Sequence, residues 1–307
     1  MARDAVIDVL GLGIVTVDEC LYVPAYPAAD AKVRVSRRLR QCGGLTGTAL
    51  VAAARQGARA AYAGCLGDDE LSDFIRENFK AEGIDASHVD GSRKSPPIHS
   101  TIVVDESAGT RAILFEMADD LAFGGIWPPE AVIHSARVLF VDHYDADRTL
   151  RAANIARHRG IPVVADFERD EGPRFGELVA VADHLILSRS FAAKVTGESD
   201  PRLMIAELWE EKRDAVIITC GEAGCWHSER DGDARHRPAF RVNAVDTTGC
   251  GDVFHGAYAA SLARGEPMDR RVAVASAAAA MKAKSPGGQA GIPTLAEVED
   301  FLRGAGS

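Results

Sequence analysis

The 307-residue sequence is poor in aromatic residues, which make up 6% of it, and no apolar run is long enough to span a membrane. A basic and then apolar opening segment, typical of a secretory signal, is also lacking. The six cysteines have no paired spacing and lack the partners that a zinc site needs. These absences predict a cytoplasmic protein with reduced thiols and without a membrane partner.

The charge balance is acidic, with 45 Asp and Glu against 35 Lys and Arg, a formal net charge of −10. Such a charge disfavours nucleic acid and anionic membranes as partners, because both repel an acidic surface. The hydrophobic fraction of 47% is sufficient for a large core. No Walker A sequence is present, and the early Gly11-x-Gly13 lacks the third glycine of a dinucleotide fingerprint.

Apolar and helix-length segments alternate along the chain, which predicts an α/β fold with a mainly parallel sheet covered by helices on both faces. The sequence pattern predicts one long buried strand over Val6–Val17 and helices over 45–57, 69–82 and 272–284. After residue 136, the predicted buried strands are Val138–Val141, Pro162–Ala165, His184–Leu187 and Ala215–Thr219.

Two other β-prone stretches, about 20–40 and 98–117, alternate apolar with polar residues, as strands with one wet face do. The second contains a hairpin signal at Ser107-Ala108-Gly109. We interpret both stretches as a small sheet that projects from the main sheet as a lid. Residues 1–307 then form one domain with these lid strands.

The segment Asp246–Asp252 (Asp-Thr-Thr-Gly-Cys-Gly-Asp) is predicted to lie between a strand over 240–245 and a helix over 253–264. Two glycines next to a helix N-terminus expose free N–H groups and the positive end of the helix dipole, which suits an anion. Asp252 beside such a site would be repelled by the anion unless it removes a proton from an attacking hydroxyl. The combination favours phosphoryl transfer to an alcohol, although a plain turn with a helix cap has the same residue types.

The run from Asp246 to Tyr258 resembles the C-terminal signature of the PfkB, or ribokinase-like, carbohydrate kinases. The segments Gly43–Ala49 and Ala53–Gly57 resemble the N-terminal motif of that family. The resemblance implies a three-layer α/β/α sandwich with a β-sheet lid, in which Asp252 is the catalytic base. It also implies that the backbone of Gly249, Cys250 and Gly251 holds the transferring phosphoryl group. Cys250 replaces the usual Ala, either as a small packing residue or as a redox-sensitive thiol.

For the sugar, the resemblance implies contacts from Asp18, at the end of the predicted first strand, and from the backbone of Gly43 and Gly44. Thr48 takes the place of the family's usual Asn. The segments Ala31–Arg34 and Gly109–Leu114 resemble ketohexokinases, and the C-terminal part resembles sulfofructose kinases. These two segments make Lys32 and Arg111 candidate contacts for the substrate, Lys32 as an anion-binding lid lysine.

For the nucleotide, the resemblance implies Thr219, Gly221 and Gly224 of a strand-ending turn, Thr247, and the loop around Gly287. Ala280 lies in an alanine-rich helix with room for a flat base. The family's Asn-x-x-Glu motif is replaced by Ser188-Arg189-Ser190-Phe191, so no protein ligand for Mg²⁺ is expected. Mg²⁺ would be held by the ATP phosphates and water. The family also implies K⁺ held by carbonyl oxygens of the segment from Asp246 and of the loop at 285–291.

Together these features predict an ATP-dependent kinase for a primary hydroxyl of a ketose or keto-acid sugar, fructose-like in shape. A kinase for an anionic sugar (sulfofructose or a sugar phosphate), a nucleoside kinase and a non-catalytic nucleotide- or sugar-binding protein remain as alternatives. The resemblance also implies a homodimer, because many family members dimerise through the lid, for which Tyr22, Val33 and Val35 would supply apolar surface.

Overall fold

The computed structural model describes residues 7–91, 96–108, 110–117, 126–169, 172–229 and 233–305. Its larger sheet has eight strands in the order β12-β11-β10-β9-β8-β7-β1-β4. The run from β10 to β4 is parallel, and β11 and β12 are added antiparallel at one edge. The strands are β1 (Ile7–Leu12), β4 (Ala60–Tyr62), β7 (Ala136–Asp142), β8 (Val163–Asp166), β9 (His184–Ser188), β10 (Ala215–Thr219), β11 (Cys225–Glu229) and β12 (Arg235–Arg237).

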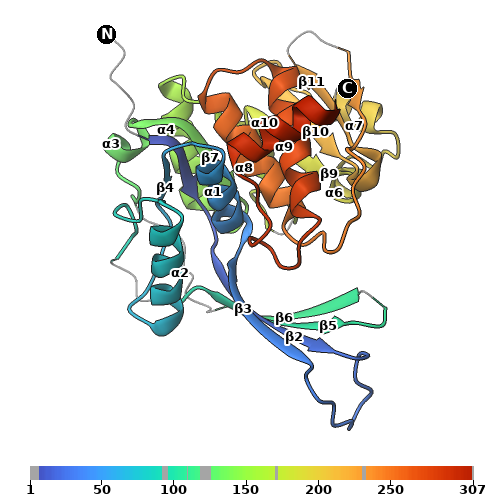
Figure 1. Cartoon of the computed structure of the whole chain (residues 1–307). Helices are drawn as coiled ribbons and strands as arrows, with labels where there is room; N and C mark the ends of the chain where they lie inside the picture. Colours follow the sequence, from blue (N-terminus) through green and yellow to red (C-terminus); the bar gives the residue numbers. More distant parts are fainter. Residues whose placement is uncertain are drawn as a thin grey trace.

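Helices cover both faces of this sheet, because successive buried residues of each parallel strand point to opposite sides. Val138 and Phe140 of β7 pack into one apolar core, whereas Leu139 and Val141 pack into the other. The first core is closed by α1 (Leu45–Arg55), α2 (Glu70–Ala81), α8 (Cys250–Ala263), α9 (Met268–Lys282) and α10 (Leu295–Ala305) (Figure 1). The second is closed by α3 (Glu130–Ile133), α4 (Ala146–His158), α5 (Phe175–Val181), α6 (Arg189–Thr196) and α7 (Pro201–Glu207).

This arrangement is the three-layer, ribokinase-like α/β fold expected from the alternating pattern, and the four strands predicted after residue 136 are confirmed. Two other predictions are wrong. Val6–Val17 is not one strand, because the backbone leaves the main sheet after Leu12 and re-enters a different sheet at Thr16. Residues 240–245 form no strand; they cross from β12 toward α8, and most of them are exposed.

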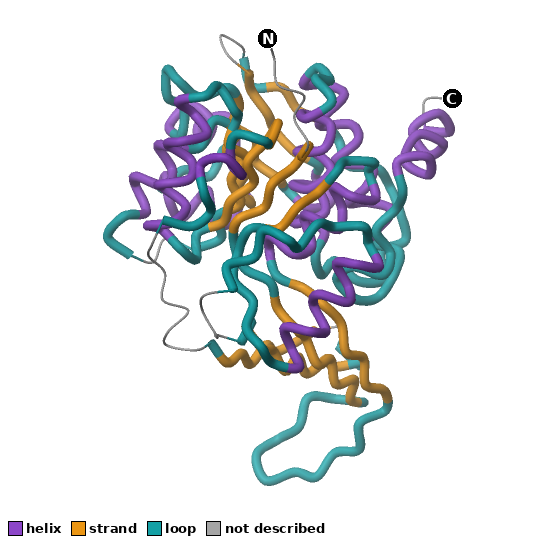
Figure 2. The backbone as a smooth tube through the Cα atoms, turned by 90° about the vertical axis from the view of Figure 1, so that its left-hand side faces the viewer, coloured by secondary structure: helices purple, strands orange, loops and turns teal. Residues whose placement is uncertain are grey.

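The second sheet has four strands in the order β3-β2-β5-β6 and stands away from the body of the molecule (Figures 1 and 2). Its strands are β2 (Thr16–Val23), β3 (Arg37–Gly43), β5 (Ile98–Asp105) and β6 (Thr110–Glu116). The predicted stretch 20–40 is strand only at its two ends, because residues 24–36 form the exposed loop at the tip of the sheet (Figure 2). Gly109 of the predicted hairpin lies outside the described residues.

A buried carboxylate fixes the point where the chain passes from one sheet to the other. Asp142, the last residue of β7, accepts hydrogen bonds from the N–H of Ile14 (2.7 Å) and the hydroxyl of Thr46 (2.9 Å). Gly13 leaves the space for this carboxylate, since a Cβ there would lie 2.1 Å from Asp142 Oδ2. Burial raises the pKa of Asp142 to about 6. The small sheet is therefore held to the main sheet edge by a polar joint.

Among the described helices, none is both long and apolar enough to cross a membrane. All six cysteines are free thiols. Cys42 and Cys225 are buried, and burial raises the pKa of each thiol to about 12, so both behave as packing residues.

Candidate active site

The turn before α8 has the geometry of an anion hole. Gly249 is the N-cap residue of α8 and has a left-handed backbone (φ 76°), and a Cβ there would lie 2.9 Å from the carbonyl oxygen of Gly288. In the described chain, the N–H groups of Gly249 and Gly251 donate to no acceptor, whereas Cys250 N–H donates to Thr247 O (3.2 Å). The donors left for an anion are thus those of Gly249 and Gly251 rather than all three that the motif suggested.

The Cys250 side chain packs behind this turn. Its thiol lies 3.5 Å from the carbonyl oxygen of Ala279, and burial raises the thiol pKa. A raised pKa leaves little thiolate at neutral pH, so the packing interpretation of Cys250 is favoured over a redox-sensitive thiol.

Asp252 lies in the first turn of α8, next to the free N–H groups. Burial raises the pKa of its carboxyl group well above the usual value, and the charges of Asp166, Glu168 and Asp18 raise it further, while Lys282 lowers it. A carboxylate with a raised pKa is a stronger base than an exposed one, provided that the pH keeps it ionised. The position and the environment of Asp252 both suit proton removal.

Asp166 and His255 form a buried pair beside Asp252. Asp166 ends β8, and its Oδ2 atom lies 3.4 Å from His255 Nδ1 with no hydrogen-bond partner among the described residues. His255 Nδ1 also lies 2.8 Å from Gly251 O, and its Nε2 lies 3.1 Å from Ile186 O. Each ring nitrogen thus faces a carbonyl oxygen. Burial lowers the pKa of His255 and raises the pKa of Asp166 well above its usual value, so burial disfavours the charged form of each group.

Asp166→Asn is expected to move the acid limb of the pH profile of kcat/KM to lower pH, by about one pH unit. Asp252 must be ionised to accept a proton, and the variant removes the negative charge that raises its pKa, so the base form persists at lower pH. The measurement is kcat/KM from pH 5 to 9, with Asp214→Asn at the opposite edge of the sheet as control. An unmoved acid limb would show that Asp166 does not act on the base.

Two of the residues predicted to contact the sugar, Asp18 and Gly43, lie close together in the small sheet, which we interpreted as the lid. Asp18 was predicted to end a strand of the main sheet, and this is wrong. It is the third residue of β2, opposite Gln41 of β3 and Ser100 of β5. Asp18 Oδ1 accepts a hydrogen bond from the hydroxyl of Thr16 (2.9 Å), and burial raises the pKa of Asp18. A Cβ on Gly43 would lie 2.4 Å from Asp18 Oδ2, so Gly43 gives this carboxylate room to face the site.

Gly44 and Thr48 lie at the start of α1, Gly44 just before the helix and Thr48 in its first turns. Gly44 is the N-cap residue and has a positive φ (87°), and a Cβ there would lie 2.8 Å from Ile14 O. Thr48 lies one turn further along: its N–H donates to Gly44 O (2.9 Å), the residue is 1% exposed, and its hydroxyl lies 3.4 Å from Gln289 Nε2. The substitution of Asn by Thr thus places a small side chain against the loop at 285–291.

The basic side chains predicted to contact an anionic substrate lie on the small sheet. Lys32 is exposed in the loop at the tip, and Arg111 is exposed on β6. Arg169, which follows β8, reaches the lid and places its guanidinium 5.5 Å from the centre of the Phe115 ring. Arg169 supplies a further cation near the lid, which the sequence analysis missed.

The predicted nucleotide turn connects β10 to β11. Thr219 ends β10, and Gly221 (φ 57°) begins the short 3-10 helix η1 (Gly221–Ala223). Gly224 has φ 88°, and a Cβ there would lie 2.0 Å from Arg237 O, so the glycine permits close approach of β12. Gly221 and the two residues that follow it are exposed, so this side of the turn is open to a ligand.

The loop around Gly287 is tied to both the α8 turn and the lid. Gly287 N–H donates to Asp246 Oδ2 (2.8 Å), and Gly288 N–H donates to Gln41 Oε1 of β3 (3.1 Å). Thr247 is exposed in the same turn as Asp246, and Ala280 is half-buried on α9. Of the predicted nucleotide residues, Thr247 and Gly287 thus flank the α8 N-terminus.

The carbonyl oxygens expected to hold K⁺ are bonded to a lysine. The Nζ atom of Lys282, the last residue of α9, donates to Asp246 O (2.9 Å) and to Thr248 O. Lys282 is 0% exposed. This part of the chain therefore does not fit a free monovalent cation.

Several residues at or near this site were missed by the sequence analysis, and one signal could have found two of them. Asp142 and Asp166 are the last residues of neighbouring parallel strands, the edge where open α/β sheets bind ligands. Lys282 and Gln41 gave no such signal, because their roles depend on segments far away in the sequence.

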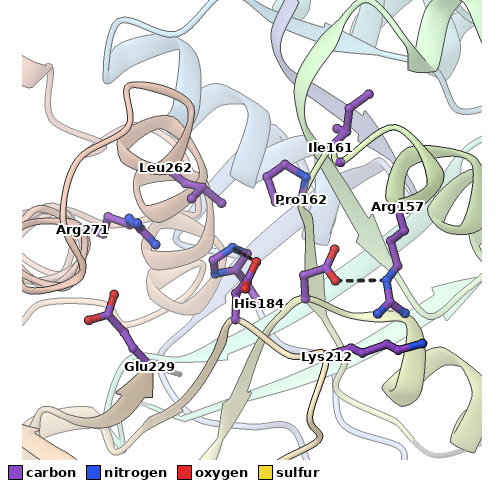
Figure 3. A pocket seen from close by; sticks show the side chains of 11 residues that line it. Arg157, Ile161, Pro162, His184, Lys212, Glu229, Leu262 and Arg271 are labelled. Carbon is purple, nitrogen blue, oxygen red and sulfur yellow. Dashed lines mark ion pairs between the residues drawn. The ribbon is translucent and has the colours of Figure 1, made fainter. Parts of the chain in front are cut away.

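A cavity of about 620 Å³ opens at the opposite, amino-terminal edge of the parallel strands (Figure 3). It is lined by His184, Leu262 and Arg271, and by the ion pair of Arg157 with Asp183 (3.1 Å). None of the predicted site residues lines it. Charged side chains of both signs line this cavity.

Comparisons with known proteins agree with this geometry. The model of a protein family described as "pfkB family carbohydrate kinase" matches residues 12–295 of this chain. A ribokinase from Haemophilus influenzae is 28% identical over 301 residues, covering 96% of this chain and 98% of that protein. An ATP-dependent ribose-1-phosphate kinase from Halopiger xanaduensis is 29% identical, covering 96% and 97%. The crystal structure of a putative ribokinase from Agrobacterium tumefaciens superposes with a TM-score of 0.90 at 28% identity, covering 97% and 98%.

Proposed function

Because this chain belongs to the pfkB family of carbohydrate kinases and is an ATP-dependent sugar kinase, we propose that its acceptor is the primary hydroxyl of a ribose-like sugar. The observation that carries the proposal is the position of Asp252 beside the free N–H groups of Gly249 and Gly251. Asp18 lies close enough for its charge to act on Asp252, so a sugar held by Asp18 has its hydroxyl near the base.

In this proposal, the residues of the site assist a single step, in which the sugar hydroxyl displaces ADP from the γ-phosphorus of ATP. Asp252 accepts the proton of the primary hydroxyl as that oxygen forms a bond to the γ-phosphorus, and the bond from the γ-phosphorus to the bridging oxygen of ADP breaks. The N–H groups of Gly249 and Gly251 and the dipole of α8 stabilise the charge on the transferring group. Mg²⁺, held by ATP phosphates and water, supplies further charge neutralisation when bound. The lid limits access of water, which would otherwise accept the phosphoryl group.

The relatives change our expectation about the sugar. The sequence analysis favoured a fructose-like ketose, but the related enzymes reported above carry the names ribokinase and ribose-1-phosphate kinase. A ribose ring has the same kind of primary hydroxyl for Asp252. A ribose-like furanose is therefore the first candidate, and the fructose-like sugar follows it.

An anionic pentose is the second candidate, supported by the cations near the lid. Arg169 lies over Phe115, and Arg111 lies close enough to the α8 site for its charge to affect the pKa of Lys282. The Halopiger relative named for ribose-1-phosphate supports the same candidate. Arg169→Gln would raise KM for such a substrate and leave KM for ribose unchanged.

The test is sugar-dependent ADP release in the presence of ATP and Mg²⁺. The panel contains ribose, ribose 1-phosphate, fructose, tagatose, 2-keto-3-deoxygluconate, sulfofructose, fructose 6-phosphate and adenosine. Highest kcat/KM with ribose supports the first candidate, and highest kcat/KM with ribose 1-phosphate supports the second. ATP binding without release of ADP across the panel would favour a non-catalytic role.

We also propose a homodimer formed through the lid. Its edge strand β6 exposes Ile113 and Leu114 by 52% and 55%, and Val33 is 39% exposed, which suits an apolar contact between two copies. Tyr22 does not contribute as predicted, because it is 8% exposed and lies under Arg37.

Leu114→Arg is expected to convert the dimer to a monomer, since it puts a charge into the apolar contact. Light scattering should give the wild type twice the 32.7 kDa mass of one chain, and should give the variant the mass of a single chain. Leu203→Arg on α7, where the leucine is 52% exposed, is the matched control and should stay dimeric. A monomeric wild type would remove the dimer from the account.

A cytoplasmic location is part of the same proposal. The co-substrate ATP is abundant there, and all six thiols are free, as they are in reducing compartments.

A further inference from the structure

Lys282 is a fully buried lysine directly behind the anion hole. It ends α9 with a side chain that is 0% exposed, and its ammonium donates to the carbonyl oxygens of Asp246 and Thr248. These carbonyls precede Gly249, the N-cap residue of α8. A buried ammonium is costly unless it is bonded and near negative charge, so its retention here requires an explanation.

The surroundings of Lys282 are those of a bound cation. Burial lowers the pKa of its ammonium, whereas Cys250, Asp246 and Asp252 raise it. The Asp246 carboxylate also accepts hydrogen bonds from Thr248 N–H (2.8 Å) and Gly287 N–H (2.8 Å). The ammonium thus lies where the turn before α8 meets the loop at 285–291.

We propose that the Lys282 ammonium is a built-in cation of the anion hole, which takes the place of a free monovalent cation and makes the kinase independent of K⁺. It is a positioning residue: it holds the carbonyls of Asp246 and Thr248 so that the N–H groups of Gly249 and Gly251 face the phosphoryl group. A free K⁺ would need the same carbonyl oxygens, and two cations cannot share them. The inference rests on the proposed function only for the part of its test that measures kinase activity.

The experiment compares wild type, Lys282→Ala and Lys282→Met in buffers with K⁺, NH₄⁺ or tetramethylammonium as the only monovalent cation. Ala leaves space in which a small cation can bind, whereas Met fills that space without charge. Lys284→Ala is the matched control, because Lys284 is exposed two residues further along.

The wild type and Lys284→Ala should keep the same activity within about twofold in all three cations. Lys282→Ala should lose about 100-fold in tetramethylammonium, because the donors of the anion hole are no longer held, and regain at least about tenfold in K⁺ or NH₄⁺. Lys282→Met should lose as much and regain nothing.

A second readout does not depend on catalysis. A cation that binds only the folded protein raises its melting temperature. K⁺ should therefore raise the melting temperature of Lys282→Ala relative to tetramethylammonium, and leave those of the wild type, Lys282→Met and Lys284→Ala unchanged.

Three results would overturn the proposal: a wild type that needs K⁺, a Lys282→Ala variant as active as Lys284→Ala, or a folded Lys282→Ala variant that no cation rescues or stabilises. Failure of the proposed function looks different. The wild type would then release no ADP with any sugar, while the cation-dependent melting of Lys282→Ala would still be observed.

Discussion

Asp252→Asn lowers kcat by about 10²–10⁴-fold in our account, because an amide cannot accept the proton of the attacking hydroxyl. Asn has nearly the same shape, and the carboxylate has no hydrogen bond to a side chain or backbone group in the described part of the chain. The KM for ATP should stay within a few-fold, since the N–H groups of Gly249 and Gly251 remain in place. The measurement is sugar-dependent ADP release at saturating ATP.

Asp269→Asn is the matched control, because Asp269 occupies the first turn of the neighbouring helix α9 but faces Arg235 at the surface. Its activity should equal that of the wild type. If Asp252→Asn were as active as this control, Asp252 would not be the base, and the proton would have to go to another group.

Gly249→Ala should lower kcat by about 10²–10³-fold, an effect comparable to the loss of an oxyanion donor. An added Cβ lies 2.9 Å from Gly288 O, and the left-handed backbone at φ 76° is strained for alanine. The turn must shift to relieve the contact, which misdirects the N–H groups toward the phosphoryl group. Steady-state kinetics and chemical denaturation measure the two consequences.

Gly265→Ala separates strain from function. Gly265 has nearly the same backbone conformation (φ 74°) just after the other end of α8, with no atom within 4 Å of an added Cβ. Both variants should lose about 1–2 kcal/mol of unfolding free energy from the left-handed residue, and only Gly249→Ala should lose activity. Equal kcat in the two variants would mean that the backbone at 249 does not hold the phosphoryl group.

The main sheet could be predicted from local pattern because its central strands are apolar on both faces. Val138–Val141 and Ala215–Thr219 illustrate this, since each is a short apolar run between helix-length segments. The break at Gly13 could not be predicted, because the residues on both sides of it are equally apolar and only the joint with Asp142 separates the two sheets. The segment 240–245 has β-prone residues but no neighbouring strand to pair with.

The candidate site also has a part that could be predicted from local sequence and a part that could not. Asp252, Gly249 and Gly251 lie in one short contiguous motif, so their association could be predicted. Asp166 and Lys282 approach that motif from β8 and from the far end of α9, and their contacts are consequences of the tertiary fold. Thr48 lies next to Gly44, as its motif predicts, but its contact with Gln289 of a distant loop could not be predicted from the motif.

The most direct test of the account is ³¹P NMR of the product made from ATP and ribose by the wild type. Transfer to the primary hydroxyl predicts a new phosphomonoester signal split into a triplet by the two protons of the attached CH₂ group. The signal should appear together with ADP and be absent from the Asp252→Asn reaction. A doublet would place the phosphate on a CH carbon, and inorganic phosphate alone would mean hydrolysis of ATP, and either result would contradict the account.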